Sequence, residues 1–562
     1  MDRRIKCFIL IFLLGFGAIL GKLFNWQILN HRALSALAGY QYKTSIEVPS
    51  PRGRIYSSDN FPLVLNQKSF LFFVDPQELN ISAEQLREEI GPAIGREDWD
   101  LEAISNKKIR FLPLSKNLSE EEKGKIEDLK IKGLGFLETE KRFYPEASMS
   151  AHLLGFVGEG ENGGAKGYFG LEGYYDQEIA GQPGLRYFEK DALGRPIPLA
   201  EELIEKPIPG RDLFLNIDRK LQFLVENHLK SGLEKYSASS GLVLIMNPQN
   251  GAVLAMASFP NYNPALYYEY NSELYRDPVI SSSFEPGSIF KVLVMAAALD
   301  SGAVKKDDVC LTCSGPRKIS DYLIKTWNEK YFPNSTMTDI IIHSDNVGMV
   351  YVGEKLGVKK FYDYLDKFGF GKKTDIDLQG EISPALRSLD DWREIDLATA
   401  SFGQGIAITP IQFLTAICVI ANQGELYQPL VVRKLLDNLG SIEIKPIKKR
   451  RVISPSTAQQ VTQMMVQAVE KGEAKWARPK NYQIAGKTGT AQIPIAGHYD
   501  PEKTIASFVG FAPPGKPAFA MLVSLKEPKS SPWGSETAAP LWFDIAKDIF
   551  RLWHIQPSSE QP

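Results

Sequence analysis

The stretch SIFKVLVMAAAL (residues 288–299) predicts a helix that is apolar on every side except for the hydroxyl of Ser288 and the ammonium of Lys291. A helix that is apolar all round is buried, and a lysine is rarely buried without a partner or a task. Side chains three positions apart share one helix face, so the lysine can activate the serine if burial and a second cation lower its pKa. The tetrad alone is weak evidence, because a serine at a helix start followed by a snorkelling lysine is an ordinary structural pattern.

Two further motifs follow the tetrad in the chain. Ser-Asp-Asn occupies residues 344–346 after an apolar helical stretch, and Lys-Thr-Gly-Thr occupies residues 487–490 within a predicted strand, 482–493. Ser-x-x-Lys, Ser-x-Asn and Lys-Thr-Gly in this order resemble the signature of penicillin-binding proteins and serine β-lactamases. The resemblance implies that Ser288 is the nucleophile of an acyl-transfer reaction.

The third motif is expected to bind substrate and to tune the first lysine. Lys487 would be the second cation that keeps Lys291 neutral, and it would attract a substrate carboxylate. Thr488 and Thr490 would offer hydroxyls to that carboxylate. Gly489 would let a substrate backbone approach the strand edge and pair with it.

The remaining motif residues are expected to stabilise the oxyanion and to transfer the proton. The backbone amides of Ser288 and Thr490 would hold the oxyanion of the tetrahedral intermediate. Ser344 would relay a proton between the lysines and the leaving amine, and Asn346 would hold the first lysine and the substrate amide. Asp345 is expected to cap the next helix rather than to react.

The resemblance covers nearly the whole chain and points to the class B penicillin-binding proteins. By analogy with that family, Arg52 and Glu172 pair to brace a pedestal, which is a structural rather than a catalytic role. Glu285 favours the septal division branch of the family over the elongation branch. The further boxes that carry the resemblance are PRGRI (51–55), RFYP (142–145), GLEG (170–173), FEPG (284–287), FGQG (402–405) and SFVGFAP (507–513).

The N-terminal residues predict a membrane anchor. Basic residues within the first six positions precede an apolar run, 7–29, that can cross a bilayer if Lys22 snorkels. Residues 18–21 (AILG) form a poor signal-peptidase site, so the segment is expected to stay uncleaved. The basic flank should remain in the cytoplasm, which puts the rest of the chain outside the cytoplasmic membrane.

Secondary-structure patterns predict an α+β fold after the anchor. A hairpin at 241–258, two strands at 505–511 and 518–525, and a helix at 538–552 suggest one antiparallel sheet flanked by helices, as in the β-lactamase and transpeptidase folds. The expected parts are a cytoplasmic tail (1–6), the anchor (7–29), a non-catalytic pedestal of the dimerisation type (30–205), a transpeptidase domain (206–555) and a tail (556–562).

Composition limits the partners and cofactors. The 562 residues have a formal net charge of −2, which gives no support to a nucleic-acid partner. Cys310 and Cys313 form a lone C-x-x-C without a histidine cluster, so a local disulfide or two free thiols are expected rather than a metal site. Covalent catalysis with an oxyanion hole needs no metal or organic cofactor.

The resemblance implies a serine D,D-transpeptidase that cross-links peptidoglycan stem peptides through an acyl-enzyme at Ser288 and that β-lactams inhibit. Because class B proteins lack a glycosyltransferase module, a polytopic membrane glycosyltransferase and division or elongation proteins are the expected partners. One alternative is a membrane-anchored β-lactamase, although the chain lacks a Glu-x-x-Leu-Asn box to activate deacylating water. The other is a non-enzymatic β-lactam sensor or scaffold, although a sensor would be expected to carry a cytoplasmic output module.

Overall fold

The computed structural model describes residues 2–95, 98–161, 163–189, 203–495 and 498–558. The chain forms two compact units, and each is described by itself. The first unit comprises Met1–Arg52 and Ala180–Gly210, and the second comprises Gly53–Ile179 and Arg211–Pro562.

The first unit contains the predicted anchor. Helix α1 (Arg3–Phe24) continues into a π-helical segment, η1 (Asn25–Leu29). The apolar stretch Arg3–Leu29 is long enough to cross a membrane, and its apolar window is not buried by protein. Long apolar helices without protein cover are suited to a lipid environment. The unit also holds α2 (His31–Tyr42) and an antiparallel sheet of β1 (Lys43–Val48), β8 (Gly184–Glu189) and β9 (Leu203–Glu205).

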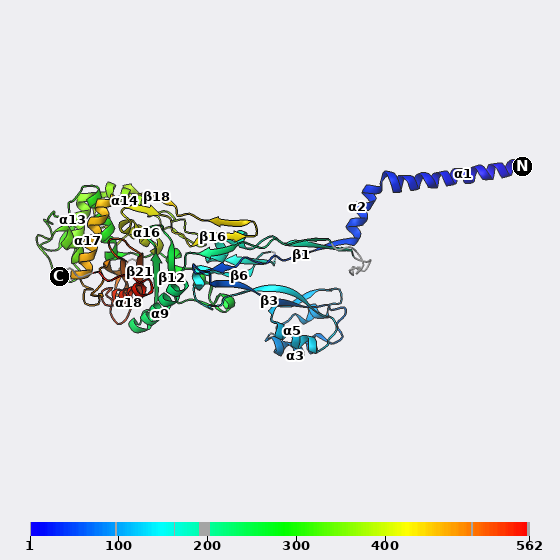
Figure 1. Cartoon of the computed structure of the whole chain (residues 1–562), viewed down its shortest axis with the longest axis horizontal. Helices are drawn as coiled ribbons and strands as arrows, with labels where there is room; N and C mark the ends of the chain where they lie inside the picture. The colour runs from blue at the N-terminus through cyan, green and yellow to red at the C-terminus, as the bar shows by residue number, and fades with distance from the viewer. Residues whose placement is uncertain (1, 96–97, 162, 190–202, 496–497, 559–562) are drawn as a thin grey trace. The chain divides into compact units, whose positions relative to one another are not determined.

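The second unit contains a five-stranded antiparallel sheet, of which Figure 1 labels strands β12 and β21. Its strand order is β12-β11-β21-β20-β19, so an early hairpin pairs with strands from the end of the chain. The expected α+β fold with an antiparallel sheet is thereby confirmed. The strands are β11 (Ser240–Met246), β12 (Val253–Phe259), β19 (Ala485–Ile495), β20 (His498–Ala512) and β21 (Phe519–Lys526).

Alternation along the strands gives this sheet two apolar faces. Val243 of β11 packs in a core with helices α9 (Arg219–Tyr236) and α18 (Ala538–Leu552). Its neighbour Leu244 packs in the opposite core with α16 (Pro410–Ala421), which is buried at every residue. Figure 1 shows α9 and α18 on one side of the sheet and α16 on the other.

The helical side of the sheet carries the first two motifs. The predicted helix 288–299 begins as a 3-10 turn, η4 (Gly287–Phe290), and continues as α11 (Lys291–Asp300). The predicted helix is therefore present, and its first turn is the tighter 3-10 form where the chain enters through Gly287 at a φ of 57°. Helices α12 (Met337–Ile342) and α13 (Asn346–Leu356) flank the second motif.

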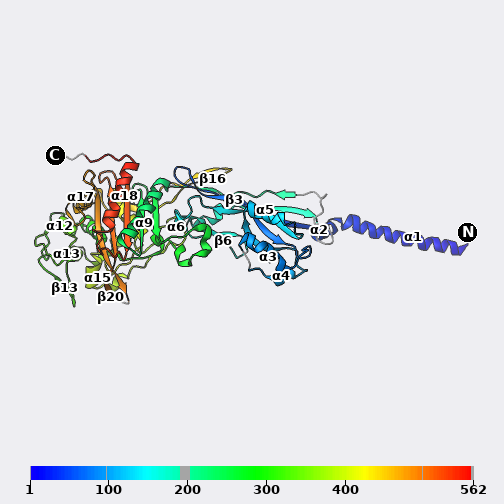
Figure 2. The ribbon, with the colours of Figure 1, turned by 90° about the horizontal axis from the view of Figure 1, so that it is seen from below.

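A second sheet in this unit has the order β17 (Gly440–Glu443), β16 (Val432–Asp437), β10, β2 (Ile55–Tyr56), β3 and β4 (Leu112–Leu118), with β5 (Leu134–Phe143) paired to β3. Strand β3 (Pro62–Val74) packs against helices α3 (Ala83–Ile94) and α5 (Glu120–Asp128) over the buried Phe72, and Figure 2 shows these helices beside β3. Strand β10 (Asp212–Leu215), which lies within the predicted transpeptidase domain, joins this sheet parallel to β2. The domain boundaries expected from the sequence remain predictions.

The other helices and strands complete the second unit. They are α4 (Leu101–Ser105), α6 (Ala151–Leu154), β6 (Phe156–Glu159), β7 (Ala165–Tyr168), α7 (Gly170–Tyr174), α8 (Asp176–Ile179), η2 (Pro264–Glu269), η3 (Ser272–Tyr275), α10 (Pro278–Ser281), β13 (Arg317–Ile319), β14 (Tyr322–Ile324), α14 (Val358–Phe368), η5 (Leu389–Asp391), α15 (Glu394–Ala400), β15 (Glu425–Tyr427), β18 (Lys448–Arg451) and α17 (Pro455–Lys471).

Candidate active site

A cleft beside the five-stranded sheet brings the three motifs together. Ser288 comes from η4, Ser344 and Asn346 from the junction of α12 and α13, and Thr488 from β19. Segments that are far apart in the sequence therefore line one cleft. Its described lining residues are Gly287, Ser288, Trp327, Ser344, Asn346, Phe402, Gln404, Glu473, Thr488, Gly489, Thr490 and Trp533.

Lys291 lies under this cleft with its side chain fully buried. Its Nζ donates hydrogen bonds to the backbone carbonyl of Ser344 at 2.6 Å, to Ser344 Oγ at 3.3 Å and to Asn346 Oδ1 at 2.7 Å. Ser288 Oγ is not among these acceptors. Lys291 is therefore held by Ser344 and Asn346 of the second motif. It lies one helical turn from Ser288 of the first motif.

Lys487 reaches the same serine from the sheet. Its Nζ donates hydrogen bonds to Ser344 Oγ at 2.9 Å and to the carbonyl of Thr488 at 3.1 Å, and its side chain is buried. Ser344 Oγ consequently lies between two lysine amines. This arrangement allows protons to pass between the three groups without large movements.

Burial lowers the pKa of both lysines, and the charge of one of them also acts on the other. Burial lowers the pKa of Lys291 well below its ordinary value, and the positive charge of Lys487 lowers it further, against the smaller opposing effects of Asp345 and Glu473. Burial also lowers the pKa of Lys487 to about 8, which the charge of Glu473 opposes. An amine with a lowered pKa can accept a proton near neutral pH, so Lys291 is suited to act as a base.

The turn that carries Ser344 is conformationally unusual. Ser344 has a φ of 55°, and a left-handed conformation costs a residue other than glycine about 1–3 kcal/mol. The next residue anchors the turn, because the Asp345 carboxylate accepts hydrogen bonds from the amides of Val347 at 2.8 Å and Gly348 at 3.1 Å. The expectation that Asp345 caps the next helix is confirmed.

Strand β19 approaches η4 very closely. A Cβ added to Gly489 would lie 2.8 Å from Ile289 Cγ2, and a Cβ added to Gly287 would lie 3.1 Å from the carbonyl oxygen of Thr490. The backbones around Ser288 and Thr490 are therefore neighbours, as two amides sharing one oxyanion must be. Thr490 Oγ1 accepts a hydrogen bond from the amide of Gly534 at 3.0 Å, so its own hydrogen can still be donated to a ligand.

The cleft also contains residues to which the motifs assigned no role. Glu473 follows α17, and its Oε2 accepts a hydrogen bond from Thr488 Oγ1 at 3.4 Å. Trp327 and Trp533 lie with ring centroids 5.0 Å apart. Gln404 belongs to the FGQG box that carries part of the family resemblance. No spacing in the sequence marks Glu473 or the tryptophans, because tertiary packing of their loops brings them to the cleft.

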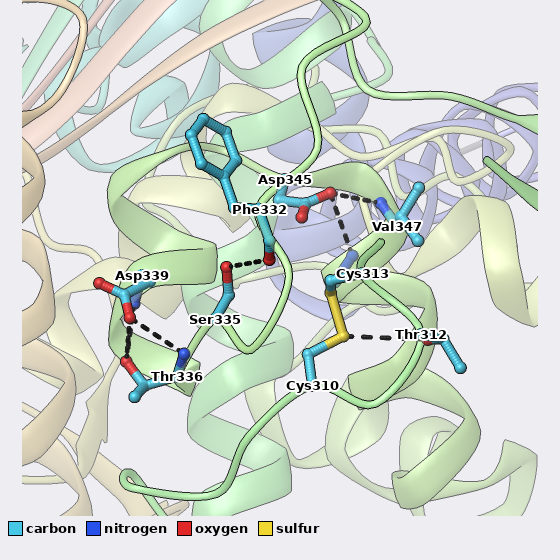
Figure 3. The surroundings of a disulfide bond; sticks show 10 residues. Cys310, Thr312, Cys313, Phe332, Ser335, Thr336, Asp339, Asp345 and Val347 are labelled. Atoms are coloured by element: carbon cyan, nitrogen blue, oxygen red, sulfur yellow. Dashed lines mark hydrogen bonds between the residues drawn. A yellow bond between two sulfur atoms is a disulfide. The ribbon is translucent and has the colours of Figure 1, made fainter. Parts of the chain in front are cut away.

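Cys310 and Cys313 form a disulfide bond (Figure 3), one of the two states expected from the sequence. The amide of Cys310 donates a hydrogen bond to the carbonyl of Ser335 at 2.8 Å. The next residue, Thr336, is the N-cap of α12. The disulfide loop is therefore attached to the start of the helix that leads to Ser344.

Arg142 and Glu172 of the predicted pedestal are not among the described residues that line this cleft. Glu172 is fully buried, and its carboxylate accepts a hydrogen bond from Arg142 Nε at 2.8 Å. Arg142 also donates to Asn66 Oδ1 at 2.6 Å. Arg52 belongs to the other compact unit, so its expected pairing with Glu172 stays a prediction.

The antiparallel sheet and the lysine pair around Ser344, next to Ser288, define a serine acyl-transfer enzyme. Residues 241–551 match the penicillin-binding protein transpeptidase domain, and residues 47–215 match the penicillin-binding protein dimerisation domain. The chain belongs to the penicillin-binding protein family and, with both domains, to its class B. The resemblance drawn from the sequence motifs is confirmed, and the chain is a serine transpeptidase.

Similarity to individual proteins extends over almost the whole chain. Stage V sporulation protein D of Bacillus subtilis is 31% identical over 98% of this chain and 87% of its own length. Peptidoglycan D,D-transpeptidase FtsI of Escherichia coli is 30% identical over 97% of this chain and 91% of its own length. The crystal structure of penicillin-binding protein 2X from Streptococcus thermophilus superposes on this chain with a TM-score of 0.74. The match covers 91% of this chain and 80% of the other chain at 23% sequence identity, which shows a shared fold.

Proposed function

We propose that this protein is a membrane-anchored D,D-transpeptidase that cross-links peptidoglycan stem peptides and is a target of β-lactams. The observation that carries this proposal is that Ser344 Oγ accepts hydrogen bonds from both Lys291 and Lys487 in the cleft that Ser288 lines. Similarity to a protein named peptidoglycan D,D-transpeptidase supports the choice of substrate.

In the proposed acylation, Lys291 accepts the proton of Ser288 as Oγ attacks the carbonyl between the two terminal D-alanines of a donor peptide. The backbone amides of Ser288 and Thr490 stabilise the oxyanion, and Asn346 holds the substrate amide. Ser344 passes a proton to the leaving nitrogen as the C–N bond breaks, and D-alanine departs. An amine from a neighbouring strand then displaces Ser288 from the acyl-enzyme.

The substrate carboxylate is bound by the third motif in this proposal. Lys487 supplies a buried positive charge, and the hydroxyls of Thr488 and Thr490 supply donors. Gly489 keeps the edge of β19 open so that the donor peptide can add to it as a further strand. A β-lactam carries a carboxylate in the same relation to its reactive amide, so it would acylate Ser288.

The proposed location follows from the N-terminal helix. The apolar stretch Arg3–Leu29 would cross the cytoplasmic membrane with its basic end in the cytoplasm and the catalytic domain outside. A polytopic membrane glycosyltransferase would supply the glycan strands, together with division or elongation proteins. Glu285 and the similarity to FtsI support a septal rather than an elongation role.

Labelling with a fluorescent penicillin tests the proposal on the full chain in membranes. The wild-type protein and the Ser283→Ala variant, which changes an exposed serine nearby, should be labelled, whereas Ser288→Ala should not. Equal labelling of Ser288→Ala would refute the proposal. An adduct that turns over within seconds would indicate a β-lactamase, and growth complementation by Lys291→Ala would indicate a scaffold.

A further inference from the structure

The cleft contains a carboxylate that the proposed acylation does not use. Glu473 is half-buried and lines the cleft together with Ser288 and Thr488. Among the described lining residues, it is the one acidic side chain. Its Oε2 accepts a hydrogen bond from Thr488 Oγ1 at an O–O distance of 3.4 Å, so it lies beside the group expected to bind the substrate carboxylate.

The backbone holds Glu473 in this position. The preceding residue, Gly472, ends α17 and packs so closely that an added Cβ would lie 2.3 Å from the carbonyl of Ala468 and 3.1 Å from the carbonyl of Ile342. Ile342 is the last residue of α12, two positions before Ser344. The end of α17 is therefore packed against the segment that carries Ser344. This packing determines the position of Glu473 in the cleft.

The negative charge of Glu473 is expected to weaken the binding of the donor peptide. The donor peptide and a β-lactam both carry a carboxylate toward Lys487 and Thr488, and Glu473 repels that charge and competes for the Thr488 hydroxyl. The charge of Glu473 also raises the pKa of Lys487 against the effect of burial. A different reactant must therefore benefit from the negative charge.

That reactant is the second substrate of transpeptidation. The acceptor amine reaches the cleft as an ammonium ion after D-alanine has left, when the leaving-group side of the cleft beside Thr488 is vacant. A carboxylate is the side chain that binds an ammonium most strongly, through charge-assisted hydrogen bonds. The positive charge of Lys487 would otherwise repel the acceptor.

We infer that Glu473 binds the ammonium group of the acceptor strand and so favours aminolysis of the acyl-enzyme over its hydrolysis. The inference rests on the proposed function. After docking, the ammonium loses one proton to solvent, and the amine nitrogen forms a bond to the acyl carbon. The bond from that carbon to Ser288 Oγ breaks, and the second proton of the amine reaches Ser288 Oγ through Ser344.

The test measures how the acyl-enzyme of the full-length protein in detergent partitions between water and an amine. The donor is the thioester N-benzoyl-D-alanyl thioglycolate, and the acceptor is D-alaninamide, which is cationic and has no carboxylate. Glu473→Gln should lower the ratio of aminolysis to hydrolysis about tenfold or more, because a hydrogen bond to a charged group is lost. Glu470→Gln, which makes the same change on α17 outside the cleft, should leave the ratio unchanged.

Two further measurements separate this role from a structural one. Hydroxylamine, which is largely uncharged at neutral pH, should be accepted equally well by the wild-type protein and by Glu473→Gln. Labelling of Ser288 by fluorescent penicillin should be as fast in Glu473→Gln as in the wild type, or faster, because a repulsive charge has been removed. An unchanged partition ratio with D-alaninamide, or an equal loss with hydroxylamine, would overturn the inference.

The proposed function can fail independently of this inference. If the wild-type protein is not labelled by penicillin at Ser288, the transpeptidase assignment is refuted whatever Glu473 does. If labelling and thioester hydrolysis proceed normally but Glu473→Gln retains full aminolysis, only the acceptor-binding role is refuted.

Discussion

Lys291 Nζ and the backbone carbonyl of Ser344 are joined by a 2.6 Å hydrogen bond that links the first motif to the second. The left-handed conformation of Ser344, with a φ of 55°, accompanies this contact. A buried amine and a conformationally costly turn therefore stabilise each other. A change at Lys291 is expected to affect both the chemistry of the cleft and the stability of the turn.

Replacing Lys291 by methionine tests this expectation. Lys291→Met keeps most of the side-chain volume but removes the base, so acylation by a labelled penicillin should slow about a thousandfold or more. The free energy of unfolding should fall by about 1–3 kcal/mol, because the Ser344 carbonyl loses its buried donor. Time-resolved labelling and denaturant unfolding measure the two effects.

A matched lysine provides the control for that variant. The side chain of Lys325 is half-exposed and donates to Glu329, which lies four residues further along the chain. Lys325→Met should leave both the labelling rate and the unfolding free energy nearly unchanged, because exposed ion pairs contribute little. If Lys291→Met acylated as fast as Lys325→Met, Lys291 would not be the base.

The rate of acylation should have a bell-shaped dependence on pH, falling at both low and high pH. Lys291 must be neutral to accept a proton, so the rate should fall as the pH decreases through its lowered pKa. Lys487 must be charged to attract the β-lactam carboxylate, so the rate should also fall as the pH rises through about 8. Lys487→Arg, whose guanidinium stays protonated, should move the upper limb to higher pH. A wild-type rate that stays constant from neutral to strongly alkaline pH would contradict this assignment of charges.

The sequence predicted the fold where local patterns and tertiary packing agree. The helix at 538–552 and the hairpin at 241–258 have clear periodicity and turn residues, and they appear in the structure as α18 and β11–β12. The sequence did not indicate that the catalytic helix begins with a 3-10 turn, η4, where Gly287 has a φ of 57° and lies against Thr490 and Ala491 of β19. An apolar pattern does not distinguish a first 3-10 turn from an α-helical one.

In the candidate active site, too, some residues could be predicted from the sequence and others could not. The motif residues were found because their order in the chain is characteristic of the family, and the structure brings them to one cleft. Glu473 was missed because it follows a helix in an undistinguished segment, and only the packing of Gly472 against Ile342 brings it to Thr488. Residues that depend on such long-range contacts have no signal in a single sequence.

The buried ion pair of the pedestal should be important for stability. The side chains of Arg142 and Glu172 are 7% and 0% exposed, so Arg142→Met would leave a buried carboxylate without this partner. Removing one member of a buried pair typically costs about 3–5 kcal/mol, and the midpoint of denaturant unfolding should fall accordingly. Arg551→Met removes a pair with Asp548 in which the arginine is 80% exposed, and it should cost less than about 1 kcal/mol. Equal losses for the two variants would contradict a bracing role for Glu172.

The spacing between β19 and η4 should control acylation without controlling folding. A Cβ at Gly489 would meet Ile289 Cγ2 at 2.8 Å and the Ile289 amide nitrogen at 3.3 Å, so Gly489→Ala must push the strand away from the turn. Oxyanion donors act only within a few tenths of an ångström of their ideal distance, and acylation should therefore slow on the order of a hundredfold. Gly124→Ala in α5, where the added methyl meets open space, should leave acylation unchanged and stabilise its helix by about 0.5–1 kcal/mol. If Gly489→Ala were acylated at the wild-type rate, the amides of Ser288 and Thr490 would not form the oxyanion hole.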